Sequence, residues 1–346
     1  MKMSTLIRPF VLISTILAAP LLQAEKPQWK LVYDNDTTNL INCDSPFRDT
    51  KQPRVFTEEM LRASVREAAI PGMGAQILSP GLGWVPWWKS DIVPLDKHEQ
   101  WFESYYGKKP RVEEHQFILA GNDMINIFVD ECRKHGNAAI ISYRVNDSHF
   151  KEFAYDKEGY KPQFAHCISQ FYVEHPEYRR YPVGKEGWGE RNHNWAIPEA
   201  RQHKLDLVTE LIRNYPNIDG VELDILRHPN YFPTDMSIEG RVDIMVDFIK
   251  KVRAALDEVA KKTDGKHRYL GTRVYSRNTL WKQIGFEPRA WADAGVDFFN
   301  LSRDYNTSDQ FTSIAEVRER APDTAIYSEI THSGYTWKLG GVDYDD

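Results

Sequence analysis

The sequence predicts an α/β fold of the (β/α)8 barrel type, and three observations support this prediction. Strand-like apolar runs alternate with amphipathic helical patterns from residue 29 onward, as they do in repeated βα units. No glycine-rich phosphate-binding loop follows the first strand, which disfavours a doubly wound dinucleotide-binding sheet. Polar residues also gather at the C-terminal ends of many different strands, where barrel enzymes place their active sites.

Seven segments have the length and apolar pattern of β-strands. They are residues 29–36, 74–79, 138–145, 219–226, 268–275, 296–302 and 324–330. A closed barrel of this type needs eight strands. Either a further strand is hidden near the first one or the barrel is C-terminally incomplete, and we expect the latter. The first and seventh strands would then have open edges, which favour aggregation.

Helical patterns separate these strands. The first helix is predicted to begin at Thr57, a capping residue that Glu58 and Glu59 follow in the first turn. In residues 122–135 the apolar side chains share one face, and Gly136 is placed to end that helix. The remaining helices are expected over residues 204–215, 239–262, 279–294 and 311–320.

Two connections are unusually long, over residues 80–119 and 147–202. Connections of this length are usually functional or disordered, and their many aromatic residues argue against disorder. Both follow predicted strands, so we interpret them as walls of a cleft at the C-terminal end of the barrel. Trp84, Trp87 and Trp88 are candidates for stacking on sugar rings there.

The N-terminus indicates export. Lys2 and Arg8 precede an apolar run over residues 10–22, and a small residue, Ala24, follows. This pattern is typical of a cleaved secretory signal peptide over residues 1–24, and the apolar run is too short to span a bilayer comfortably. We therefore expect one barrel domain over residues 25–346, in the periplasm or outside the cell. The formal net charge of −6 argues against a nucleic-acid partner.

Cysteine and histidine spacing predicts neither a metal site nor a cofactor. The three cysteines, which we expect to be buried thiols, are Cys43, Cys132 and Cys167. His193 and His203 are ten residues apart and His228 stands alone, so no zinc-protease motif is present. A calcium ion held by aspartates stays open as an alternative. A Gly-x-Ser-x-Gly motif is absent, which disfavours a serine hydrolase.

The fourth predicted strand carries the most specific functional signal. Its helix-facing row consists of Val221, Leu223 and Ile225. Side chains alternate along a strand, so Glu222 and Asp224 point together into the barrel. Two inward carboxylates are costly unless they are paired or used. The two interpretations are catalysis and a buried ion pair with Arg144 or Arg273.

Glu329, at the end of the seventh strand, is the second candidate catalytic carboxylate. The fourth and seventh strands lie roughly across a barrel from one another, so acids there could attack a glycosidic bond from both sides. The alternative for Glu329 is an ion pair with a neighbouring arginine or with His332. On the first strand, Tyr33 and Asn35 are the alternative to Asp34 and Asp36 as the inward pair. Further candidates for substrate binding at strand ends are Asp34, Asp36, Arg144, Asn146, His149, Arg227, His228, Arg273, Tyr275 and Asn300.

These strand ends resemble those of bacterial glycoside-hydrolase-like (β/α)8 barrel proteins, the glycosyl-hydrolase-like or family-10-like group. The matching stretches are residues 33–36 (YDND), 143–147 (YRVND), 219–224 (DGVELD) with 227–229 (RHP), and 327–329 (YSE). The resemblance implies Glu222 or Asp224 as the acid/base and Glu329 as the nucleophile. The commonest retaining pattern ends the fourth strand with Asn-Glu rather than Glu-Leu-Asp. The choice between the two acids, and between retention and inversion, therefore stays open.

The leading functional hypothesis is hydrolysis of an oligo- or polysaccharide. One alternative is a polysaccharide lyase or oligosaccharide dehydratase, with Tyr143, Tyr275, His149 or His228 as the base and Arg144 neutralising a uronate. Another is a carbohydrate-binding barrel without catalysis. The arginines and histidines at the strand ends favour an anionic substrate that carries uronate or sulfate. The alternative is that they neutralise the acids of the site.

Overall fold

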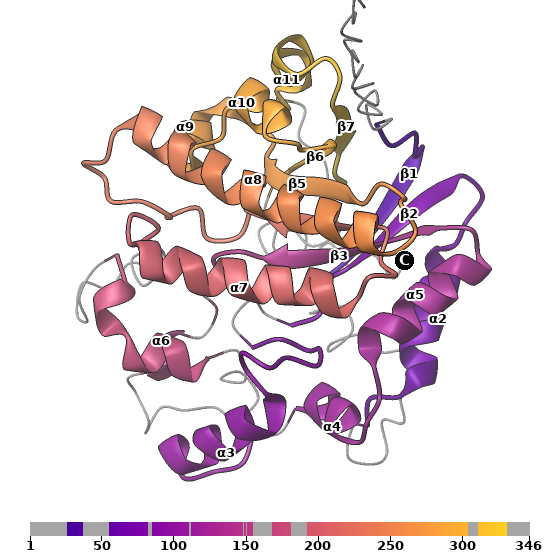
Figure 1. The fold of residues 1–346 in the computed structure, drawn as a ribbon, viewed down its shortest axis with the longest axis vertical. Helices are drawn as coiled ribbons and strands as arrows, with labels where there is room; N and C mark the ends of the chain where they lie inside the picture. Colours follow the sequence, from indigo (N-terminus) through magenta and orange to yellow (C-terminus); the bar gives the residue numbers. More distant parts are fainter. Residues whose placement is uncertain are drawn as a thin grey trace, which may run out of the picture.

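The computed structural model describes residues 26–36, 55–81, 85–110, 112–147, 149, 151–154, 168–180, 192–303 and 311–330. Within them, seven parallel strands form one sheet in the order β1 to β7, with helices around it (Figure 1). The strands are β1 (Leu31–Asn35), β2 (Met73–Leu78), β3 (Ala138–Arg144), β4 (Gly220–Asp224), β5 (Tyr269–Tyr275), β6 (Phe298–Ser302) and β7 (Ala325–Ser328). This sequential parallel order is that of a (β/α)8 barrel with seven of its eight strands described, which confirms the predicted fold class.

The two ends of the sheet approach each other. Trp29, just before β1, stacks on Tyr327 of β7 with ring centroids 6.2 Å apart. Asp34 of β1 and Glu329, directly after β7, both contact the guanidinium group of Arg273 on β5. The sheet therefore curls into a nearly closed barrel.

The floor of the barrel, at the N-terminal ends of the strands, is apolar. Its buried centre consists of Ala75, Ile77, Ile140 and Phe298. Trp29 packs edge-on against Phe298 and against Tyr269, at centroid distances of 5.5 and 5.0 Å. A glycine is required at Gly271, because a Cβ there would lie 2.0 Å from Cζ of Phe298. Side chains thus fill the floor.

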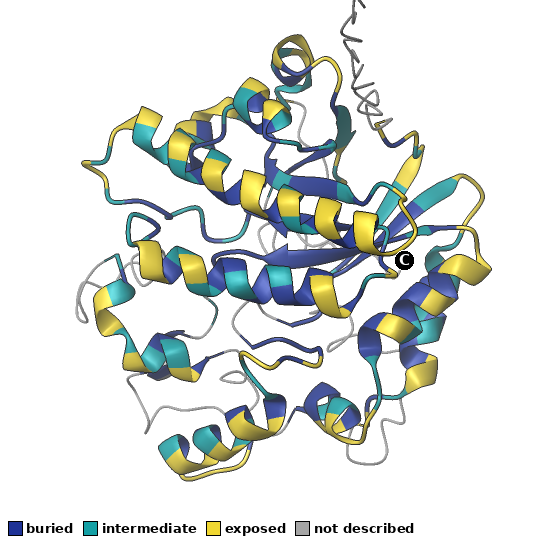
Figure 2. Cartoon of the chain, viewed as in Figure 1, coloured by how far each residue is buried: buried dark blue, intermediate teal, exposed yellow. Residues whose placement is uncertain are grey.

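Most helices cover the outside of the sheet and bury their apolar faces on it, whereas the helices over residues 95–106 and 170–174 pack against each other in a separate cluster (Figure 2). The two helices that flank β4, α7 and α8, lie side by side (Figure 1). The helices are α2 (Glu58–Ala68), α3 (Leu95–Tyr106), α4 (Glu113–Leu119), α5 (Met124–Lys134), α6 (Gln170–Glu174), α7 (Pro198–Asn214), α8 (Ile238–Lys262), α9 (Trp281–Ile284), α10 (Pro288–Asp293) and α11 (Ile314–Arg320). The outward-facing residues Val221, Leu223 and Ile225 belong to the same apolar core. Glu222 and Asp224 therefore lie on the inner face of β4.

Several local predictions match the structure, and one helix differs. The Thr57 hydroxyl accepts a hydrogen bond from the Met60 amide at 3.3 Å and caps α2, as predicted. The expected helix over residues 279–294 is wrong as a single element, because it is divided into α9 and α10. Gly285 ends α9 with a φ of 68°, and Pro288 begins α10.

The long connections are more regular than the sequence predicted. Residues 80–119 contain α3 and α4, and residues 147–202 contain α6 and the start of α7. Among the described residues, no helix combines the length and apolarity needed to cross a bilayer. Cys132 is a buried free thiol. The predicted signal peptide, Cys43 and Cys167 lie outside the described residues.

Candidate functional site

Charged side chains line the opposite end of the barrel interior, at the C-terminal ends of the strands. They come from β1, β3, β4 and β5 and from the residues that follow β1, β3, β4 and β7. The carboxyl groups are Asp34, Asp36, Asp147, Glu222, Asp224 and Glu329, and the guanidinium groups are Arg144, Arg227 and Arg273. We call these nine residues the mouth cluster.

Arg273 connects three strands of the mouth cluster. Its Nε and Nη2 donate to the two carboxylate oxygens of Glu329 at 2.8 and 2.5 Å. Its Nη1 lies 3.4 Å from Asp224, and its Nε lies 3.6 Å from Asp34. Burial lowers the pKa of Arg273, but the three carboxylates outweigh it and raise that pKa well above its usual value. The arginine therefore stays charged and fixes the side chain of Glu329.

Arg144 is the second buried arginine that contacts several acids, and we call Arg273 and Arg144 the hub arginines. Its Nη1 lies 3.2 Å from Asp147, its Nε lies 3.8 Å from Asp224, and its Nη2 binds Asp36. Asp36 also contacts Arg227 at 3.2 Å. The ion-pair interpretation of the acids therefore holds for Asp224, which both hub arginines contact, and for Glu329 through Arg273.

Glu222 has a different environment from Asp224. Its side chain is 0% exposed and accepts hydrogen bonds from Ser142 Oγ at 2.9 Å and from Asn300 Nδ2 at 3.3 Å. Burial, together with the nearby charge of Asp34, raises the pKa of Glu222 well above its usual value. Both effects favour the protonated form of this carboxyl group over the ionised form.

The first strand turns its two aspartates inward. Asp34 and Asp36 contact the hub arginines, whereas Asn35 faces α2 and donates to Ser64 Oγ at 3.3 Å. Burial raises the pKa of Asp34 to about 7, against the lowering effect of Arg273. The sequence had left open whether Asp34 and Asp36 or Tyr33 and Asn35 point into the barrel.

The tryptophans expected to stack on sugar need correction. Trp87 is 1% exposed and its Nε1 hydrogen-bonds to His115 Nε2 at 3.1 Å. Trp88 is 5% exposed and its Nε1 lies 3.4 Å from Glu210. Both rings belong to the apolar core, so neither presents an open face to a ligand.

Several of the remaining candidates are also buried, and others lie outside the described residues. Tyr275 and Tyr143 are buried in the main core, and Tyr143 faces the outer layer. Asn146 is buried and its Nδ2 lies 3.5 Å from the Asn230 carbonyl. Trp84 and His332 lie outside the described residues.

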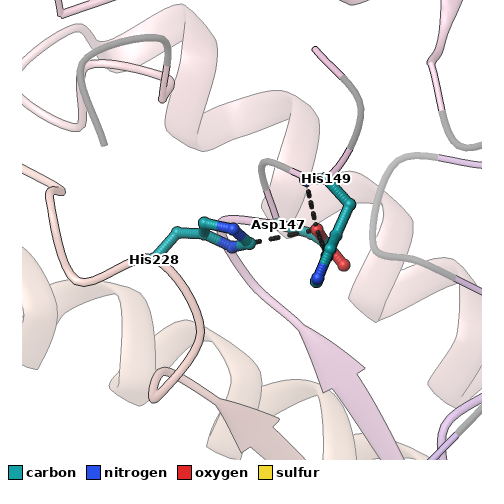
Figure 3. Close-up of side chains that lie close together, drawn as sticks. All are labelled: Asp147, His149 and His228. Atoms are coloured by element: carbon teal, nitrogen blue, oxygen red, sulfur yellow. Dashed lines mark hydrogen bonds and ion pairs between the residues drawn. The ribbon is translucent and has the colours of Figure 1, made fainter. Parts of the chain in front are cut away.

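One group that sequence reasoning missed lies beside the mouth cluster (Figure 3). Asp147 and His149 follow β3, His228 follows β4, and one ligand-type atom from each lies within 4.8 Å of the others. Burial raises the pKa of Asp147, but His149, Arg144 and His228 outweigh it and hold that pKa well below its usual value. The available signal was Asp-x-His after one strand and a histidine after the next, because neighbouring parallel strands end side by side.

No protein-family profile matches the chain, and no curated protein matches it. Solved structures that are similar to it include a cycloisomaltooligosaccharide glucanotransferase from Paenibacillus sp., complexed with cycloisomaltoheptaose. Its identity is 10% and its TM-score 0.44, over 79% of this chain and 36% of that one.

Two further similar structures are a class V chitinase from Cycas revoluta and a family 20 β-N-acetylglucosaminidase. The chitinase, a mutant in complex with (GlcNAc)3, is 12% identical over 80% of this chain and 56% of that one, with a TM-score of 0.38. The glucosaminidase is 10% identical over 88% and 53%, with a TM-score of 0.43. The chain thus spans 36–56% of the length of these three proteins, and we transfer no residue role or activity from them.

Proposed function

We propose that the protein is a glycoside hydrolase whose active site is the mouth cluster. The observation that carries this proposal is the contrast between two acids on one strand. Burial raises the pKa of Glu222 well above its usual value, whereas Asp224 contacts two arginines. Glycoside hydrolysis needs one carboxyl group as the acid and a second as the nucleophile or base, and the mouth cluster offers Glu222 beside the arginine-bound Asp224 and Glu329.

The roles follow from contacts and access. Glu222 carries the proton that the leaving oxygen requires. Glu329 is 14% exposed and makes a bidentate contact with Arg273, so we assign it as the nucleophile or general base. Asp224 positions Arg273 against Glu329 from the opposite side.

The charge of the mouth cluster favours an uncharged glycan as substrate. It contains six carboxyl groups and three arginines, and all three arginines already contact protein carboxylates. A uronate or sulfate would have to displace one of these ion pairs. The same contacts give less support to elimination, because Arg144 is occupied by Asp36, Asp147 and Asp224. The N-terminal pattern of residues 1–24 supports our proposal that the enzyme is exported.

The test is a set of soluble neutral and uronate-containing polysaccharides incubated with the full chain, with products analysed by chromatography and ultraviolet absorbance. We expect hydrolysis products from a neutral glycan. Glu222→Gln and Glu329→Gln should each reduce kcat at least about 100-fold. The matched control is Asp235→Asn, an exposed carboxylate after β4, which should leave the rate unchanged.

Three results would contradict the proposal. Wild-type rates in both glutamine variants would exclude these acids from catalysis. Sugar binding without any turnover would favour a binding barrel. An unsaturated uronate product, seen by its new absorbance, would favour a lyase.

A further inference from the structure

Three side chains with metal-binding chemistry meet at the ends of β3 and β4 (Figure 3). Asp147 and His149 are two residues apart in one connection, and His228 comes from the next strand along the barrel. Asp147 and His228 are buried, whereas the His149 side chain is 26% exposed. Two members of the group are therefore shielded from solvent, and His149 is the member that solvent can reach.

The separations suit a single ion. Asp147 Oδ1 lies 2.6 Å from His149 Nδ1 and 3.8 Å from His228 Nδ1. Tetrahedral zinc with bonds of about 2.0–2.1 Å keeps its ligand atoms roughly 3.3 Å apart, between these two values. The imidazole rings are nearly perpendicular, at 88°, with centroids 4.8 Å apart. All three ligand atoms lie within 4.8 Å of one another, so rotation of the side chains would be needed to bring them onto one centre.

The protein also holds these ligands from behind. Arg144 Nη1 lies 3.2 Å from the second carboxylate oxygen of Asp147, and the His149 amide donates to the first at 2.9 Å. Asn192 Nδ2 donates to the His228 carbonyl at 2.9 Å, and Lys151 Nζ donates to Asn192 Oδ1 at 3.0 Å. Outer contacts of this kind orient the ligands in metal sites.

We propose that Asp147, His149 and His228 bind a divalent transition-metal ion of the zinc class. Two imidazoles and one carboxylate suit zinc, cobalt, nickel or ferrous iron, whereas magnesium and calcium prefer oxygen ligands throughout. Three protein ligands leave a coordination position for water or a sugar hydroxyl. The ion would also offset the excess of carboxyl groups in the adjacent mouth cluster, which shares Asp147 and Arg144 with this site.

The experiment is calorimetric titration of the full chain with zinc chloride after dialysis against a chelator. Titration with cobalt chloride, followed by visible absorption, reports the coordination geometry around the ion, and the histidine variants identify the ligands. We expect one ion per chain. His149→Ala and His228→Ala should each weaken binding at least about 100-fold and abolish the cobalt spectrum.

The matched control is His267→Ala. His267 Nε2 also lies 3.0 Å from an aspartate, Asp297, but that pair is at the other end of β5 and outside the three-residue group. This variant should bind zinc and cobalt as the wild type does. Circular dichroism of every variant shows whether it is folded. His149 is the safer of the two test positions because its side chain is partly exposed.

Two outcomes would overturn the metal site. One is a wild-type chain that takes up no stoichiometric zinc or cobalt, which would make the group a hydrogen-bonded Asp–His–His cluster. The other is unchanged binding in folded His149→Ala and His228→Ala. Neither readout uses a sugar, so failure of the metal site and failure of the proposed hydrolase are separate results.

Discussion

The floor and the mouth of the barrel are built from the inward rows of the same strands, yet their chemistry is opposite. On β5 the inner row passes from Tyr269 through Gly271 to Arg273. On β6 it passes from Phe298 to Asn300, which contacts Glu222. The change from ring packing to ion pairs takes only two residues. A single strand thus serves structure at one end and chemistry at the other.

The two ends also differ in what they contribute to stability. Burial of apolar and aromatic surface at the floor is favourable by about 25 cal/mol per Å². At the mouth, removing charges from water is unfavourable, and the arginine–carboxylate contacts offset this cost without exceeding it by much. We therefore expect the floor to stabilise the fold and the mouth to depend on complete charge pairing.

Removal of one hub arginine should have the largest effect. Arg273→Met leaves Asp34, Asp224 and Glu329 without their shared partner, so we expect the free energy of unfolding to fall by about 3–5 kcal/mol. Urea denaturation measures this value. Arg289→Met is the control, because Arg289 is 62% exposed and its pair with Asp293 contributes less than about 1 kcal/mol. Equal stability of the two variants would show that the mouth does not need charge pairing.

Truncation at the floor should affect stability but spare the chemistry. Trp29→Ala removes a ring that contacts Tyr269, Phe298 and Tyr327, and we expect a loss of about 2–3 kcal/mol. The rate of a folded variant on its substrate should be close to that of the wild type. Thermal unfolding and turnover, measured on the same sample, test both parts. A large loss of kcat at full stability would mean that floor and mouth are not separable.

The effect expected to be smallest per pH unit is on the pH dependence of stability. Because the pKa of Asp34 is raised to about 7, the folded chain keeps a proton that the unfolded chain releases at about pH 4. The contribution of Asp34 to stability is therefore present at low pH and is lost as the pH rises from about 4 to 7. One such group gives a slope of at most about 1.4 kcal/mol per pH unit.

Asp34→Asn should make this slope shallower without abolishing it, because Glu222 also has a raised pKa. Urea denaturation at several pH values between 4 and 7 measures the change. A variant with the wild-type slope would show that Asp34 is already ionised in the folded protein at low pH.

Much of the fold could be predicted from the sequence because its local signals agree. The runs over residues 138–145 and 268–275 match β3 and β5 to within one residue at each end. Alternation along β4 correctly placed Glu222 and Asp224 on the inner face. The prediction of one helix over residues 279–294 was wrong because the apolar periodicity continues across Gly285 and Pro288. The backbone does not continue as a helix there, since Gly285 ends α9 and Pro288 begins α10.

The site was less predictable, because side-chain pairing depends on which strand ends meet in space. The sequence does not show whether an arginine already forms ion pairs within the protein. In the structure, Arg144 and Arg273 both pair with carboxylates of the chain. Burial of Trp87 and Trp88 likewise depends on partners far along the chain, His115 and Glu210. The group of Asp147, His149 and His228 required the adjacency of β3 and β4, which a one-dimensional motif does not contain.

The position of Arg144 has one more consequence. A single guanidinium group connects acids from β1, from β4 and from the turn after β3. Because the three acids share this one guanidinium group, a substitution at any of them changes the electrostatic field at the other two. Segments that lie far apart along the chain are therefore linked through one side chain, and an exchange at one strand end would be felt at the other two.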